Sequence, residues 1–80
     1  MIVFVKYFGL IKDETNVDEE FLELNLNMSL TGFIEETLFI KYPSLNKIDF
    51  RVAVNKEICD NNHQISDEDK LSILPFFSGG

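Results

Sequence analysis

The stretch SLTGFIEETLFIKYP, residues 29–43, is the part of the chain with a clear helical period. A set of mostly apolar residues recurs in it at intervals of three and four, which places these residues along one side of a helix. Ser29 is of the residue type that accepts a hydrogen bond from the first turn, and Pro43 cannot continue the hydrogen-bond ladder. The stretch therefore predicts one amphipathic helix with Glu35 and Glu36 on its solvent side. The positions predicted on the other side are Leu30, Phe33, Ile34, Thr37, Leu38 and Lys41.

Two strands are predicted before this helix. Residues 2–8 (IVFVKYF) are rich in β-branched and aromatic side chains, which favour a strand. Gly9 interrupts that pattern, and the acidic run 12–20 has no period, so we expect a solvated loop there. Residues 21–26 alternate leucines with polar residues, which predicts a second strand with one buried face. The leucines expected on that face are Leu22, Leu24 and Leu26.

Three strands are predicted after the helix, at residues 50–54, 57–59 and 70–74. Asn55 and Lys56 form the expected turn between the first two. Residues 60–69 are expected to be a loop that ends in an acidic turn. In the last strand, Leu71 and Ile73 are predicted to point inward, and Ser72 and Leu74 outward.

This order of elements predicts an α+β fold in which one main helix packs on one face of a mixed sheet of four or five strands. The first and last strands are expected to lie side by side and parallel at the centre of the sheet. That arrangement is the ubiquitin-like β-grasp. We expect residues 1–75 to form the domain and residues 76–80 to form a flexible tail.

Size and charge exclude several classes of function. A chain of 80 residues buries only about 60–65% of its unfolded surface, so a deep enzyme cleft is not expected. Its formal net charge of −7 is the wrong sign for nucleic acid or an anionic membrane. The single cysteine, Cys59, and single histidine, His63, are too few for a zinc site, so no metal is expected. With no secretion signal and no internal disulfide, the expected compartment is the cytoplasm.

The last seven residues, LPFFSGG at 74–80, differ in kind from the rest of the chain. At average glycine usage, a Gly-Gly end arises by chance with a probability of about 0.5%. Without Cβ atoms, Gly79 and Gly80 allow the backbone to thread a narrow channel. A carboxylate that is delivered in this way needs activation, for instance as an acyl adenylate, before it can accept sulfur or an amine. The tail therefore predicts a carrier whose chemistry belongs to its partners.

The chain resembles the ubiquitin-like sulfur carriers of the ThiS/MoaD type, and among them the family of small subunits of molybdopterin synthase. The resemblance rests on Tyr7-Phe8, Ala53-Val54-Asn55, Asp67-Glu68-Asp69 and the segment 74–80, in this order and spacing. Two departures stand out. Family members often have glycine where this chain has Glu68, and a second proline where it has Phe76.

The resemblance implies a sulfur-delivery cycle. A ubiquitin-activating-like adenylyltransferase would use ATP to adenylate the Gly80 carboxylate, and a sulfurtransferase would supply the sulfur that makes it a thiocarboxylate. The tail would then deliver sulfur to cyclic pyranopterin monophosphate in the large subunit of molybdopterin synthase. The carrier itself would be non-catalytic, bind no permanent cofactor and form a hetero-oligomer with the large subunit. Gly80 would be the covalent site, and Gly79 would let it reach the enzyme.

A docking surface is predicted on the sheet side away from the helix. Exposed apolar side chains that gather there, Phe4 included, would mark a partner interface. In the family, positions matching Phe8, Ile58 and Leu74 contact the large subunit. The negative charge would steer the carrier toward basic partner surfaces. The residues predicted to bind a partner are Phe8, Ile58, Leu74, Pro75, Phe76, Phe77 and Ser78.

Three alternatives stay open. A thiamine-pathway sulfur carrier shares the fold and the diglycine, although chain length and Pro75 favour the molybdopterin pathway. A ubiquitin-like modifier would instead form an isopeptide bond through Gly80. A plain interaction domain would make no chemical use of its tail.

Overall fold

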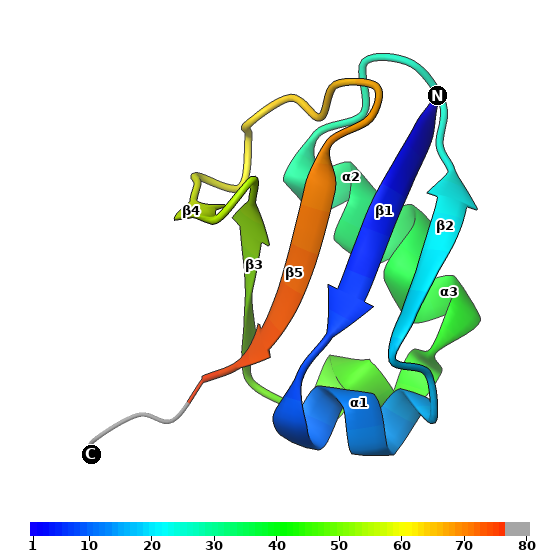
Figure 1. The fold of residues 1–80 in the computed structure, drawn as a ribbon, viewed down its shortest axis with the longest axis vertical. Coiled ribbons are helices and arrows are strands. Elements are labelled where there is room, and N and C mark those ends of the chain that lie inside the picture. Colours follow the sequence, from blue (N-terminus) through cyan, green and yellow to red (C-terminus); the bar gives the residue numbers. More distant parts are fainter. Residues whose placement is uncertain (77–80) are drawn as a thin grey trace.

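The computed structural model describes residues 1–76, so predictions that concern Phe77, Ser78, Gly79 and Gly80 lie outside the described residues. Five strands and several helical segments follow one another along the chain (Figure 1). In order they are β1 (Ile2–Tyr7), α1 (Gly9–Thr15), β2 (Glu19–Glu23), α2 (Leu30–Phe33), the π-helical turn η1 (Ile34–Leu38), α3 (Phe39–Lys41), the 3-10 helix η2 (Pro43–Lys47), β3 (Phe50–Val54), β4 (Glu57–Ile58) and β5 (Lys70–Pro75).

The five strands form one mixed sheet in the order β2-β1-β5-β3-β4. β1 and β5 are parallel neighbours at its centre, with Val5 opposite Leu71, and the other neighbouring pairs are antiparallel. The run from α2 to α3 lies across one face of this sheet (Figure 1). The predicted ubiquitin-like β-grasp is confirmed, including the parallel pairing of the first and last strands.

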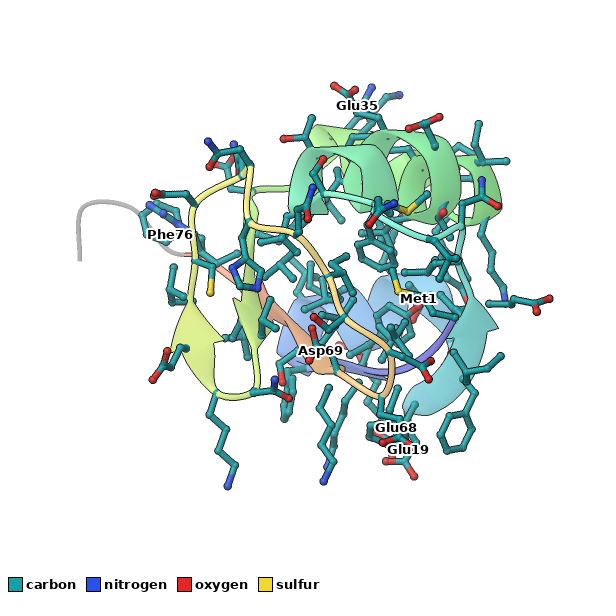
Figure 2. The ribbon with its side chains drawn as sticks, turned by 90° about the horizontal axis from the view of Figure 1, so that it is seen from above. Met1, Glu19, Glu35, Glu68, Asp69 and Phe76 are labelled. Carbon is teal, nitrogen blue, oxygen red and sulfur yellow. The ribbon has the colours of Figure 1, made fainter. Side chains whose placement is uncertain are left out.

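The predicted main helix begins and ends where its sequence signals lie. The Ser29 hydroxyl oxygen accepts a hydrogen bond of 3.1 Å from the Gly32 N–H, which caps the first turn. The middle of the run is a π-helical turn in which the Phe39 N–H donates to the Ile34 carbonyl five residues earlier. Pro43 then opens the 3-10 helix η2. Glu35 points away from the sheet, whereas Glu19 and Glu68 lie on the opposite side of the molecule (Figure 2).

The hydrophobic core lies between the main helix and the inner face of the sheet. Leu71 and Ile73 on β5 are fully buried, as predicted. Full burial of one such side chain stabilises the fold by about 1.5–3 kcal/mol. The other core residues on strands and main helix are Val3, Val5, Tyr7, Val52, Val54, Leu30, Phe33 and Leu38.

The prediction for residues 9–26 is partly wrong. Residues 9–15 form the helix α1, which includes the first part of the predicted loop 12–20, because Ile11 and Thr15, one turn apart, bury their side chains. Its end is an Asn16 in the left-handed conformation, whose N–H donates to the Lys12 carbonyl. β2 covers residues 19–23 instead of 21–26, and Leu26 lies beyond it with 75% of its surface exposed.

Within residues 1–76, the helices are too short and too polar to cross a membrane.

Candidate docking face and tail root

The face of the sheet away from the main helix is the candidate docking face, and we call it the outer face. Strand register decides which side chains belong to it, since directly opposite residues point to the same side. Phe4 lies opposite Lys70, Lys6 opposite Ser72, and Leu74 opposite Arg51. On the neighbouring strands β1, β5, β3 and β4, the outward positions are Ile2, Phe4, Lys6, Lys70, Ser72, Leu74, Arg51, Ala53 and Ile58.

Several predicted partner-binding residues meet on or beside this face. Phe8 follows β1, and its N–H donates a 3.1 Å hydrogen bond to the Ile73 carbonyl, which brings Phe8 beside Leu74. Ile58 lies on the outermost strand, opposite Ala53, and is 57% exposed. The structure thus places Phe8, Ile58 and Leu74 on one side of the sheet, while Phe77 and Ser78 fall outside the described residues.

The root of the tail is fixed by two contacts of Phe76. Its N–H donates a 3.2 Å hydrogen bond to the Asp49 carbonyl, and its ring lies 4.2 Å from the Arg51 guanidinium carbon. A proline at this position, which the family resemblance implies, would have no N–H to donate. The departure at Phe76 therefore extends the backbone pairing by one residue beyond Pro75, where β5 ends, to Asp49, the residue before β3.

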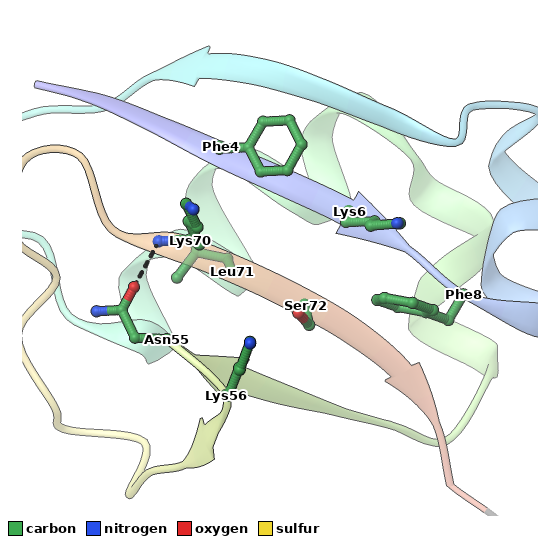
Figure 3. Close-up of a pocket in the computed structure, with 8 residues that line it drawn as sticks. All are labelled: Phe4, Lys6, Phe8, Asn55, Lys56, Lys70, Leu71 and Ser72. Atoms are coloured by element: carbon green, nitrogen blue, oxygen red, sulfur yellow. Dashed lines mark hydrogen bonds between the residues drawn. The ribbon is translucent and has the colours of Figure 1, made fainter.

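A hollow of about 530 Å³ opens in the middle of the outer face (Figure 3). Ser72, a small side chain, lies near its centre, with Phe4 and Phe8 along one side and Lys56 on the other (Figure 3). A hollow with apolar walls can receive a side chain from a partner. Its full lining is Phe4, Lys6, Phe8, Asn55, Lys56, Lys70, Leu71 and Ser72.

The sequence prediction placed Lys6 on the same side of the first strand as Phe4 and Phe8, but it missed the other cations of this face. Lys6, Arg51 and Lys70 point outward by register, and Lys56 stands in the adjoining turn. Alternation within the last strand could have placed Lys70 on this side as well. Arg51 and Lys56 join them only because β3 lies next to β5 in the sheet.

The departure at Glu68 falls on a strained backbone position. Glu68 has φ +68°, in the left-handed region that favours glycine. Its N–H nevertheless donates a 2.9 Å hydrogen bond to the Ile2 carbonyl, which ties the acidic turn to the start of β1. The two neighbouring carboxylates also hold this turn in place. Asp67 accepts a hydrogen bond from the Ile2 N–H, and Asp69 accepts hydrogen bonds from the Ser66 N–H and the Asn55 amide.

A second group that the sequence prediction missed lies on the inner side. Glu20 lies opposite Val5 and accepts hydrogen bonds from the Tyr7 hydroxyl (2.6 Å), the Tyr42 hydroxyl (2.7 Å) and the Lys41 ammonium (2.6 Å). Burial alone would raise the pKa of the Glu20 carboxyl, but the hydrogen bonds from Lys41, Tyr7 and Tyr42 outweigh it and lower that pKa. The pKa of Tyr7 is raised, mainly by burial and next by the hydrogen bond to Glu20. The same two causes raise the pKa of Tyr42 to about 12. This group joins β1, β2 and the end of the main helix, so we assign it to stability.

The outer face has apolar side chains, cations and a hollow, and each of these features can contact the surface of another protein. Among residues 1–76, no three histidine, cysteine or acidic side chains gather as a metal site would require. The fold and this face define a small ubiquitin-like carrier or modifier that works through a partner. Residues 5–80 match the ThiS family model, and the chain belongs to that family.

Solved structures carry the same fold. A protein from Pyrococcus furiosus described as molybdopterin converting factor, subunit 1, is 25% identical, with a TM-score of 0.86 over 92% of this chain and 95% of that one. In a complex of subunits 1 and 2 of molybdopterin-converting factor from Helicobacter pylori, the matching chain is 26% identical, with a TM-score of 0.69 and full coverage of both chains. SAMP1 from Haloferax volcanii matches with a TM-score of 0.84 over all of both chains at 16% identity, which shows the fold alone.

Proposed function

We propose that this chain is the sulfur carrier of molybdenum cofactor biosynthesis. The observation that carries the proposal is the Gly79-Gly80 end of a ThiS-family chain whose family match runs through residue 80. The two converting-factor relatives support the molybdenum pathway, since both reach 25% identity or more over nearly the whole chain.

The proposed cycle places the chemistry on the Gly80 carboxylate. An adenylyltransferase joins this carboxylate to the AMP part of ATP and releases pyrophosphate. The terminal sulfur of a sulfurtransferase persulfide would then attack the acyl carbon and displace AMP, and a thiol reductant would cleave the resulting acyl disulfide to leave a thiocarboxylate. The large subunit of molybdopterin synthase would receive the thiocarboxylate and pass its sulfur to cyclic pyranopterin monophosphate, and water would cleave the acyl–sulfur bond and return the carboxylate.

The described residues have a supporting part in this proposal. Phe8, Leu74 and Phe76 form an apolar margin beside the point where the tail leaves β5. A partner that holds this margin keeps the tail close to its own active site, and binding energy spent on positioning lowers the barrier to the later transfer. Gly79 would let the terminus pass through a channel too narrow for side chains.

Deletion of Gly80 tests the pathway. In cells that depend on this chain, we expect molybdoenzyme activity to be lost and growth without thiamine to be unaffected. A variant with one alanine added after Gly80 is the matched control, because it keeps every native residue and only moves the carboxylate; it should fail as well. Molybdoenzyme activity that survives both changes would refute the proposal. A new requirement for thiamine would show that the chain acts in the thiamine pathway instead.

A ubiquitin-like modifier is the second candidate, and the observation that favours it is the same Gly79-Gly80 end on a ubiquitin-like fold. Conjugation would join Gly80 to a target lysine through an isopeptide bond. Higher-mass conjugates that carry this chain and disappear on deletion of Gly80 would support that function over sulfur delivery.

A further inference from the structure

The net charge of the chain hides an uneven distribution. Fourteen acidic residues face seven basic ones. Four of the seven basic residues are on the outer face or in the turn at its margin: Lys6, Arg51, Lys56 and Lys70. The outward positions of β1, β5, β3 and β4 include three cations and no carboxylate. Glu19 and Glu23 are outward as well, but on β2 at one flank.

Glu19 lies directly opposite Lys6 and offsets part of its charge, whereas Arg51, Lys56 and Lys70 have no carboxylate at ion-pair distance among residues 1–76. Among residues 1–76, the ion pairs are Lys12 with Asp18 and Lys41 with Glu20, neither of which involves an outer-face cation. In the nearest acidic turn both Asp69 carboxylate oxygens accept hydrogen bonds, from the Asn55 amide and the Ser66 N–H, while Asp67 and Glu68 line a neighbouring hollow together with Lys70. Lys6 lies 5.4 Å from the centre of the Phe8 ring, and Arg51 lies over Phe76, so the charges stand beside apolar rings.

Lys56 occupies a position where its side chain is disfavoured by the backbone. Asn55 and Lys56 have φ +50° and +74°, the two left-handed central residues of a tight hairpin turn. Glycine is the preferred residue at the second of these positions. A lysine there instead holds a charge at the margin of the hollow around Ser72 (Figure 3).

We infer that the outer face docks an acidic surface of a partner protein, with partner carboxylates opposite Lys56, Lys70 and Arg51 and an apolar side chain seated in the hollow over Ser72. This inference rests on the proposed function, because it concerns the partners of the same carrier. It is opposite in sign to the expectation from the net charge. A protein is favoured over a nucleic acid because the chain as a whole repels polyanions.

Binding measurements on matched charge changes test the inference. Calorimetry would follow the full chain against the large subunit and the adenylyltransferase of the same organism, at low and at high salt. Lys56→Glu is expected to weaken binding to at least one of them about tenfold, because opposed charges become like charges. Lys47→Glu changes the net charge equally, on η2 outside the sheet, and should weaken binding less than about twofold.

A second variant separates docking from folding. Lys56→Gly removes the charge and relieves the left-handed backbone, so it should raise the melting temperature and still weaken binding. The inference would be overturned if wild type, Lys56→Glu and Lys56→Gly bound with equal affinity. It would also be overturned if the affinity of the wild type did not change with salt concentration. Either result would leave the proposed function standing. A wild-type chain that binds neither protein would overturn both. Binding of a single-stranded RNA that Lys56→Glu abolishes, with protein affinity unchanged, would also overturn it.

Discussion

Gly9 and Pro75 lie so close that a Cβ atom on Gly9 would stand 3.2 Å from the Pro75 ring carbon Cγ. Gly9 also has φ +51°, which L side chains rarely adopt. The contact joins the start of α1 to the last residue of β5, directly before the tail root. Glycine at position 9 therefore lets the chain turn into α1 while the end of β5 packs against that turn.

Gly9→Ala is expected to lower the free energy of unfolding by about 1–2 kcal/mol from the left-handed conformation alone. The close Pro75 ring adds to the loss, because a proline ring has little freedom to move. Urea denaturation measures this loss in the free energy of unfolding. Gly32→Ala is the control: its Cβ would meet the flexible side chains of Glu36 and Met28, and alanine is favoured in a helix, so no loss is expected. Equal effects of the two changes would contradict this account.

Glu68→Gly is expected to stabilise the domain by about 1 kcal/mol, because glycine adopts φ +68° without the Cβ penalty. Glu68→Ala removes the same carboxylate but keeps the Cβ, so it isolates the backbone effect and should give no such gain. Thermal and urea denaturation of the two variants decide the matter. If both variants gain equally, relief of negative charge is the cause instead of the backbone.

Glu20→Gln is expected to lower the free energy of unfolding at neutral pH by about 1–3 kcal/mol, because it weakens the bonds to two tyrosines and removes the charge opposite Lys41. Glu19→Gln, one residue earlier on the outward side of β2, is the control and should change it by less than about 0.5 kcal/mol.

The Glu20 group also predicts the pH dependence of stability. The folded-state pKa of Glu20 is lowered, so its stabilisation is present above its ordinary value of 4.5 and is lost as pH falls through the folded pKa. The pKa of Tyr42 is raised from 10.0 to about 12, so its contribution is present below pH 10 and is lost as pH rises through about 12. Stability curves of Glu20→Gln and Tyr42→Phe should each lose the corresponding slope. Unchanged slopes would show that other groups control the titration.

The sequence predicts the main helix and the central strands because each has a regular period and a boundary signal, such as Ser29 or Pro43. It does not reveal α1, since a seven-residue helix with Ile11 and Thr15 as its buried positions is too short to show a period. The inward Glu20 is equally hidden. A glutamate in an alternating strand normally indicates the wet face, and only the tertiary partners Tyr7 and Tyr42 make its burial favourable.

The candidate site divides in the same way. Phe8 and Leu74 could be predicted on the outer face from strand alternation and the family resemblance. The cationic surface could not, because Arg51 and Lys56 reach it through the order of strands in the sheet, which the local sequence does not encode.

The central claim is that Gly80 carries sulfur, and the intact mass of the chain isolated from cells that make it tests this most directly. We expect a fraction of molecules whose mass exceeds that of the unmodified chain by the difference between one sulfur and one oxygen, and we expect this fraction to vanish when the adenylyltransferase is deleted. An unmodified carboxylate under every growth condition, including those that demand molybdoenzymes, would contradict it.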